Sequence, residues 1–89
     1  MSTGAGPGSR SDYSMQLHNF FQKEENRGNG GRLAFSEQGM GPAHNPVWTI
    51  NVHIDGEVWG TSSDVRKQVA KNWAAREAMI QFRIPFLDE

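Results

Sequence analysis

The stretch that decides the fold runs from residue 41 to residue 60, GPAHNPVWTINVHIDGEVWG. Its central part alternates apolar and polar residues, which is the pattern of a strand with one buried face. The alternating apolar residues are Trp48, Ile50, Val52 and Ile54. Asp55-Gly56 follows at once, and this pair favours a two-residue hairpin turn because both residues tolerate positive φ. Val58 and Trp59 then supply the returning strand, so the stretch predicts a β-hairpin.

A helix is predicted after the hairpin, from about Ser63 to Phe82. Ser62 or Ser63 can serve as its N-cap, with Asp64 favourably placed in the first turn. Alanines recur every four residues along it, which allows the helix to lie close against a sheet. These alanines are Ala70, Ala74 and Ala78. Pro85 marks the end of the helix.

Two further elements are predicted before the hairpin. Residues 13–25 place Leu17, Phe20 and Phe21 on one face of a helix. A cluster of Gly and Asn over residues 26–31 ends that helix, and a short strand around Leu33 and Phe35 leads into a loop at 39–46. The predicted order is α-β-β-β-α, an α+β fold with two helices packed on one face of a three-stranded antiparallel sheet.

Composition limits what this chain can be. Its 89 residues allow one compact domain, which we expect at residues 13–83, with a disordered tail at 1–12 and a C-terminal tail at 84–89. The net charge of −1 argues against a protein that binds nucleic acid over its whole surface, so any phosphate site must be local. The absence of cysteine fits an intracellular protein. No segment has the roughly 20 apolar residues of a membrane span, and no secretory signal is visible.

The loop, the hairpin and the helix segment RKQVAKNWAA together resemble the double-stranded-RNA-binding domain family. The family pattern is a GPxHxPxF loop, a hairpin and a KKxAKxxAA helix, and the resemblance covers about residues 13–82. It implies that double-stranded RNA is the partner. Members of the family span about 16 base pairs, and they touch two successive minor grooves and the phosphates between them.

The resemblance implies three groups of RNA contacts. In the loop they are Pro42 and His44, although a His between prolines can also simply close a turn. At the start of the last helix they are Arg66, Lys67, Gln68 and Lys71, which can also be an ordinary solvated basic face. On the first helix they are Gln16, His18 and Asn19, which can also be a plain polar face.

The sequence departs from the family in two of these groups. Gln68 stands where a second lysine is usual, and the segment 61–65 before the helix looks longer than in the family. Asn19 and His18 stand where the family commonly presents a glutamate and a glutamine. Asn19 can still donate to and accept from a ribose 2′-hydroxyl.

Catalysis is not expected, because no convergent set of acidic, nucleophilic or metal-binding residues is apparent. The three histidines fall on different elements without carboxylates at ligand spacing, so neither a metal nor another cofactor is predicted. The alternative function is a protein-interaction or dimerisation module of the same fold. The negative net charge, Gln68 and Asn19 favour it, and Val69 and Trp73 either extend the core or form an apolar patch.

Overall fold

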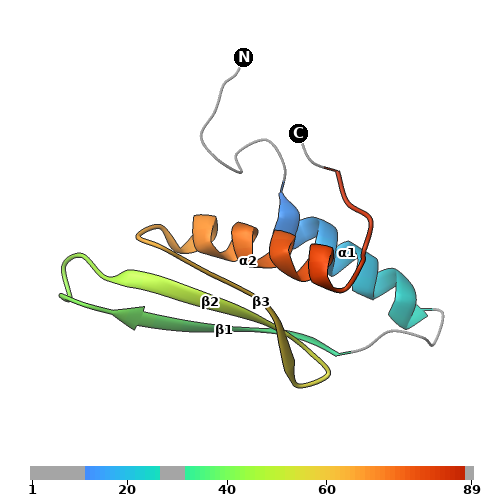
Figure 1. Cartoon of the computed structure of the whole chain (residues 1–89), viewed down its shortest axis with the longest axis horizontal. Coiled ribbons are helices and arrows are strands. Elements are labelled where there is room, and N and C mark those ends of the chain that lie inside the picture. The colour runs from blue at the N-terminus through green and yellow to red at the C-terminus, as the bar shows by residue number, and fades with distance from the viewer. Residues whose placement is uncertain (1–11, 27–31, 88–89) are drawn as a thin grey trace, which may run out of the picture.

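The computed structural model describes residues 12–26 and 32–87, and it contains two helices and three strands in those ranges (Figure 1). Their bounds are α1 (Tyr13–Asn26), β1 (Leu33–Met40), β2 (Val47–Ile54), β3 (Glu57–Asp64) and α2 (Lys67–Gln81). The predicted α-β-β-β-α order is confirmed. The predictions of a disordered tail at 1–12 and of a helix-ending cluster at 26–31 lie outside the described residues except for Asp12 and Asn26, and Asn26 is the last residue of α1.

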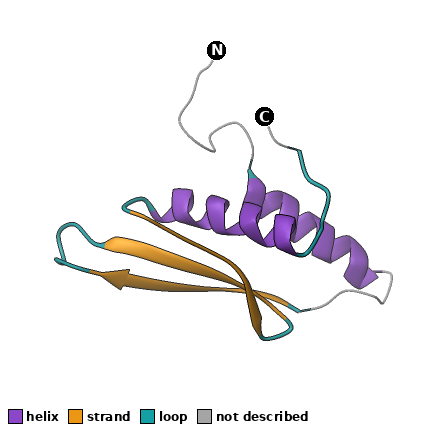
Figure 2. Cartoon of the chain, in the orientation of Figure 1, coloured by secondary structure: helices purple, strands orange, loops and turns teal. Residues whose placement is uncertain are grey.

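The sheet has the strand order β1-β2-β3, and both pairings are antiparallel. Both helices cover the same face of this sheet (Figure 2). The alternation of β2 predicted the buried face correctly, since Ile50, Val52 and Ile54 are buried. A bulge between Val52 and His53 shifts the register of β3 against β2. Predicted as a short strand, β1 has eight residues and continues to Met40.

The core lies between the sheet and the two helices. Leu17 and Phe21 contribute from α1, and the alanine stripe of α2 is fully buried, as the four-residue spacing predicted. Gly60 on β3 makes this close packing possible. A Cβ atom at that position would lie 2.7 Å from the backbone N of Ala78 and would also collide with the backbone O of Ala74. The helix therefore approaches β3 at a distance that only glycine permits.

The predicted start of α2 is wrong by four residues. Ser62 and Ser63 belong to β3, where the Ser63 hydroxyl hydrogen-bonds to Thr49 Oγ1 across the sheet at 2.8 Å. The N-cap position is Arg66, with no side-chain cap. Asp64 accepts the backbone N–H of Arg66 at 2.8 Å and so acts before the helix rather than in its first turn. The segment that looked like a long loop is strand, because the eight residues of β2 offer it a pairing partner.

Residues just outside the predicted domain at 13–83 contact the helices and the core. Asp12 caps the N-terminus of α1, because its carboxylate accepts the N–H of Met15 at 3.1 Å. At the other end Ile84 is buried, and the ring of Phe86 packs edge-on against Tyr13. Ile84 and Phe86 therefore pack on the fold, in the segment that the sequence analysis assigned to a C-terminal tail.

Candidate nucleic-acid interface

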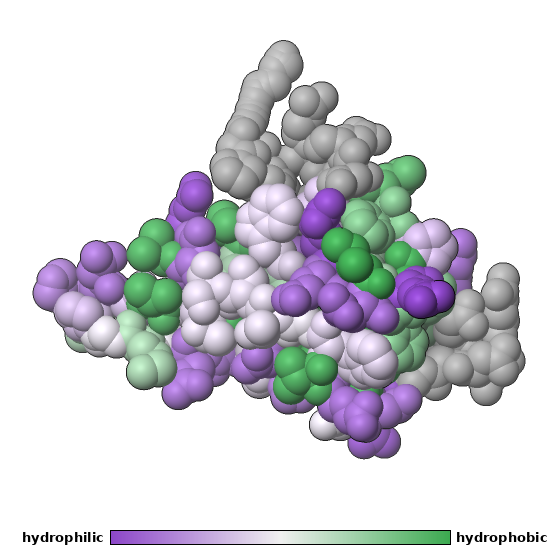
Figure 3. Space-filling view, viewed as in Figure 1, coloured by the Kyte–Doolittle hydropathy of each residue, from purple (hydrophilic) through white to green (hydrophobic). Residues whose placement is uncertain are grey.

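The loop between β1 and β2 has a constrained backbone and an exposed histidine. Gly41 has a φ of 99°, a conformation that favours glycine, and the N–H of Asn45 donates to the carbonyl of Pro42 at 3.0 Å. Pro42 and His44 are exposed. No described residue hydrogen-bonds to the His44 side chain, so its imidazole is available to a ligand. Hydrophilic and hydrophobic residues lie next to one another at this end of the molecule (Figure 3), and Met40 and Val47, which flank the loop, are exposed.

The start of α2 lies beside this loop and presents a basic cluster. The Nζ of Lys67 lies 4.2 Å from the centroid of the ring of Trp48, the second residue of β2 after the loop. The same Nζ atom of Lys67 lies 3.1 Å from Oε1 of Glu37. Arg66 Nε lies 3.7 Å from the Asp64 carboxylate. Two of the three cations of the cluster are therefore paired with carboxylates, and Gln68 is exposed next to them.

The third cation, Lys71, lies over a different ring. Its Nζ is 4.9 Å from the centroid of the Phe35 ring on β1. The imidazole of His18 on α1 is stacked on the same ring, with centroids 5.6 Å apart and planes 19° from parallel. Phe35 thus joins the candidate residues of α1 to those of α2.

The structure does not bring all of the α1 candidates together. Residues 16 and 18 are about 200° apart around a helix, so Gln16 and His18 point in different directions. The amide of Gln16 donates to the carbonyl of Leu87 at 3.0 Å and accepts the N–H of Leu87 at 2.7 Å. Asn19 is exposed, and no described residue hydrogen-bonds to its side chain. His18 and Asn19 therefore remain candidates, whereas Gln16 binds the C-terminal segment.

Two electrostatic features favour anions at the start of α2. The first turn of the helix contains no acidic residue, and its first N–H groups have no partner within the helix. These groups carry partial positive charge, which adds to that of Arg66, Lys67 and Lys71. Such a site binds a phosphate without reading a sequence.

Sequence reasoning missed three residues of this surface: Phe35, Glu37 and Trp48. All three lie on the sheet face that the helices cover. Glu37 pairs with buried Ile50, Phe35 is two residues from Glu37 on β1, and Trp48 is two residues from Ile50 on β2. The alternation around Phe35 was visible in the sequence and placed Glu37 on the same face. Which lysine lies over which of these side chains depends on how α2 crosses the sheet.

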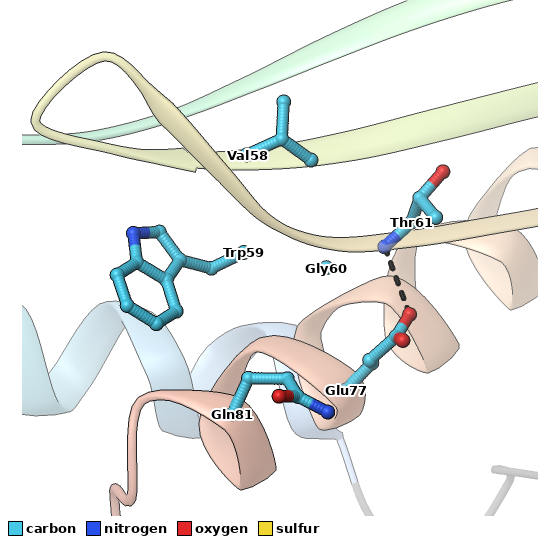
Figure 4. Close-up of a pocket in the computed structure, with 6 residues that line it drawn as sticks. All are labelled: Val58, Trp59, Gly60, Thr61, Glu77 and Gln81. Atoms are coloured by element: carbon cyan, nitrogen blue, oxygen red, sulfur yellow. Dashed lines mark hydrogen bonds between the residues drawn. The ribbon is translucent and has the colours of Figure 1, made fainter.

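A groove lies on the other side of α2, between that helix and the open edge of β3 (Figure 4). Its volume is about 300 Å³. The Glu77 carboxylate accepts the N–H of Thr61 at 3.0 Å within it, so one hydrogen-bonding group of the strand edge is covered. The lining residues are Val58, Trp59, Gly60, Thr61, Glu77 and Gln81.

Within residues 12–26 and 32–87, no group of three or more His, Asp or Glu side chains is arranged to hold a metal ion. No helix among the described residues is long and apolar enough to cross a membrane.

Comparison with known proteins agrees with this geometry. The double-stranded RNA binding motif family matches residues 13–81. Ribonuclease 3 of Bacillus licheniformis is 36% identical over 72 residues, which are 81% of this chain and 28% of that enzyme. The solution structure of both double-stranded-RNA-binding domains of DRB4 with their linker superimposes with a TM-score of 0.63 at 23% identity, and it covers 91% of this chain and 50% of that one.

The fold and the family match define a nucleic-acid-binding module of the α-β-β-β-α class. The chain belongs to the double-stranded RNA binding motif family, and membership implies binding to double-stranded RNA. It spans 28% of the length of the ribonuclease that it resembles.

Proposed function

We propose that the chain binds double-stranded RNA by shape, through the loop at 41–46, the start of α2 and the exposed face of α1. One observation carries the proposal. Lys67 contacts Trp48, which follows the loop by two residues, so the cations at the start of α2 lie near the end of the loop that carries exposed His44. A minor-groove contact and a phosphate contact at a fixed separation are what recognition of an A-form duplex requires.

The loop supplies the first minor-groove contact. The imidazole of His44 can donate to or accept from a ribose 2′-hydroxyl, and the backbone around Pro42 offers a carbonyl beside it. The turn between Pro42 and Asn45 constrains the loop backbone before RNA arrives, which lowers the backbone entropy lost on binding. Contact with 2′-hydroxyls distinguishes RNA from DNA.

The start of α2 supplies the phosphate contacts. Arg66, Lys67 and Lys71 provide charge, Gln68 donates through its amide, and the free N–H groups of the first helical turn complete the site. Phosphates of both strands face this surface across the major groove. These contacts set affinity and carry no sequence information.

On α1, His18 and Asn19 supply the contacts to a second minor groove. His18 is oriented by its stacking on Phe35. Gln16 takes no part in the proposed contacts, because Leu87 occupies both ends of its amide.

Binding without catalysis is the role that we assign to these residues, in an intracellular setting. The similarity to ribonuclease 3 covers 28% of that enzyme, so its activity does not transfer to this chain. No metal or other cofactor is part of the proposal.

A second candidate function is association with another protein, including a second copy of this chain. The observation that favours it is the groove beside β3, because exposed Val58 lines it and exposed Phe82 packs on Trp59 of the same lining. Sedimentation equilibrium separates the two candidates. A monomer that binds duplex RNA supports the first function, and a stable dimer without RNA binding supports the second.

Titration of duplex RNA, duplex DNA and an RNA–DNA hybrid over a salt series tests the first function. We expect preference for duplex RNA and a steep loss of affinity with salt, because phosphate contacts release counterions. His44→Ala should weaken binding without lowering the melting temperature, since the side chain is exposed. Equal affinity for the three duplexes would contradict the proposal.

A further inference from the structure

Lys67, the first residue of α2, holds its charge between an aromatic ring and a carboxylate. Its Nζ lies 4.2 Å from the centroid of the Trp48 ring and 3.1 Å from Oε1 of Glu37. Both charged side chains are 44% exposed. The pair is therefore at the surface, where solvent and a ligand reach it.

The position of Glu37 follows from the strand register. Glu37 pairs with buried Ile50 and shares the helix-facing side of β1 with Phe35. Two residues along a strand span about 6.6 Å, and four residues along a helix span about 6 Å. The two lysines of α2 therefore meet successive side chains of β1: Lys71 lies over Phe35, and Lys67 reaches Glu37.

The two lysines are electrostatically unequal as a result. Among the residues that the structure describes, no carboxylate lies within ion-pair distance of Lys71, which rests on an aromatic ring. Lys67 has a carboxylate in direct contact. A phosphate that approaches Lys67 must displace this carboxylate or share the ammonium group with it, and in both cases two negative groups come close together.

We propose that Glu37 competes with RNA phosphate for Lys67 and thereby lowers affinity for double-stranded RNA. This inference rests on the proposed function, because it takes Lys67 as a phosphate contact. An exposed ion pair is weak enough for a phosphate to displace, so Glu37 tunes binding without abolishing it. The slightly negative chain thus contains, inside its own binding surface, an acid that limits how tightly the surface binds.

Glu37→Gln tests the inference, with Glu57→Gln as the matched control. Both substitutions remove one negative charge from an exposed strand residue. Glu57 pairs with Ile54, six residues along β2 from Trp48, and is therefore about 20 Å from the Lys67 site. In fluorescence anisotropy with a duplex RNA of about 20 base pairs at 0.1 M salt, Glu37→Gln should bind roughly two- to fivefold tighter than wild type. Glu57→Gln should match wild type.

Salt dependence supplies a second readout. The gain from Glu37→Gln should shrink toward zero near 0.5 M salt, because the Debye length falls to about 4 Å there. Thermal unfolding by circular dichroism confirms that each variant is folded. Glu37→Thr, which keeps a strand-favouring side chain, replaces Glu37→Gln if the latter unfolds.

A third measurement repeats Glu37→Gln in a Lys67→Gln background, where the gain should largely disappear. An unchanged gain there would overturn the inference, because Glu37 would then act by general repulsion of RNA. Unchanged or weaker binding by Glu37→Gln, with wild type binding normally, would overturn the inference and leave the proposed function intact. Failure of wild type to bind duplex RNA would overturn both.

Discussion

Replacement of Lys71 by glutamine should remove one phosphate contact and little else. The Lys71 ammonium group lies 4.9 Å from the Phe35 ring centroid, without a carboxylate among the described residues to neutralise it. Each phosphate contact changes the logarithm of the binding constant by about 0.9 per tenfold change in salt. One lost contact therefore weakens binding about eightfold at 0.1 M salt and about twofold at 0.4 M.

Fluorescence anisotropy with duplex RNA at about 0.05–0.4 M salt measures the affinity and the slope of the logarithm of the binding constant against the logarithm of the salt concentration. The slope for Lys71→Gln should be shallower than that of wild type by about one, with the same loss for unrelated duplex sequences. Arg83→Gln is the control, because it removes one exposed positive charge beyond the end of α2, and the helix alone spans about 15 Å from Lys71 to Gln81. It should leave both quantities unchanged.

The result that would refute this reasoning is a parallel slope with reduced affinity at every salt concentration. Such a result would mean that Lys71 acts through packing on Phe35 rather than through charge. The lost cation–π contact is worth about 0.5–1 kcal/mol, so a melting temperature lowered by a few degrees is compatible with the prediction.

Three further predictions concern stability and are measured by thermal unfolding. Gly60→Ala should destabilise the fold by about 3 kcal/mol, because its Cβ would lie 2.7 Å from the Ala78 backbone N; a melting temperature within a few degrees of wild type would contradict the close approach of α2 to β3. Arg83→Gly should stabilise it by about 0.5–1 kcal/mol, since Arg83 has a φ of 61°; a loss of stability would show that the Arg83 side chain matters more than its backbone strain. Gln16→Ala should cost about 1 kcal/mol through its two bonds to Leu87 and change RNA affinity less than about twofold; the reverse pattern would return Gln16 to the interface.

A phosphate site on a chain with a net charge of −1 depends on the local arrangement of charges rather than on their sum. Asp64 and Glu37 each pair with one cation at the start of α2, and Lys71 retains its full charge. The local field at the helix N-terminus therefore depends on these pairs more than on the total charge of the chain.

The sequence by itself determined the element order and the core face of β2. These features depend on local patterns: the period of two in β2, the Asp55-Gly56 turn and the four-residue spacing of alanines in α2. Gly60 was not recognised in advance as the residue that permits close packing. Its role depends on α2, which is distant in sequence from the hairpin turn.

The start of α2 and the limits of the folded unit were decided by tertiary structure. A serine before a helix is a good N-cap when nothing competes, but β2 offered Ser62 and Ser63 a strand partner. In the same way, Ile84 and Leu87 looked like a tail because their partners, the core and Gln16, are far away in the sequence.

The candidate site likewise contains residues that the sequence identified and contacts that only the tertiary structure decided. The loop motif and the lysine spacing are local, so the sequence named Pro42, His44, Lys67 and Lys71 as candidates. The partners of the two lysines come from β1 and β2, and they depend on the angle at which α2 crosses the sheet. Only the tertiary structure therefore decided that Lys67 faces a carboxylate while Lys71 rests on an aromatic ring.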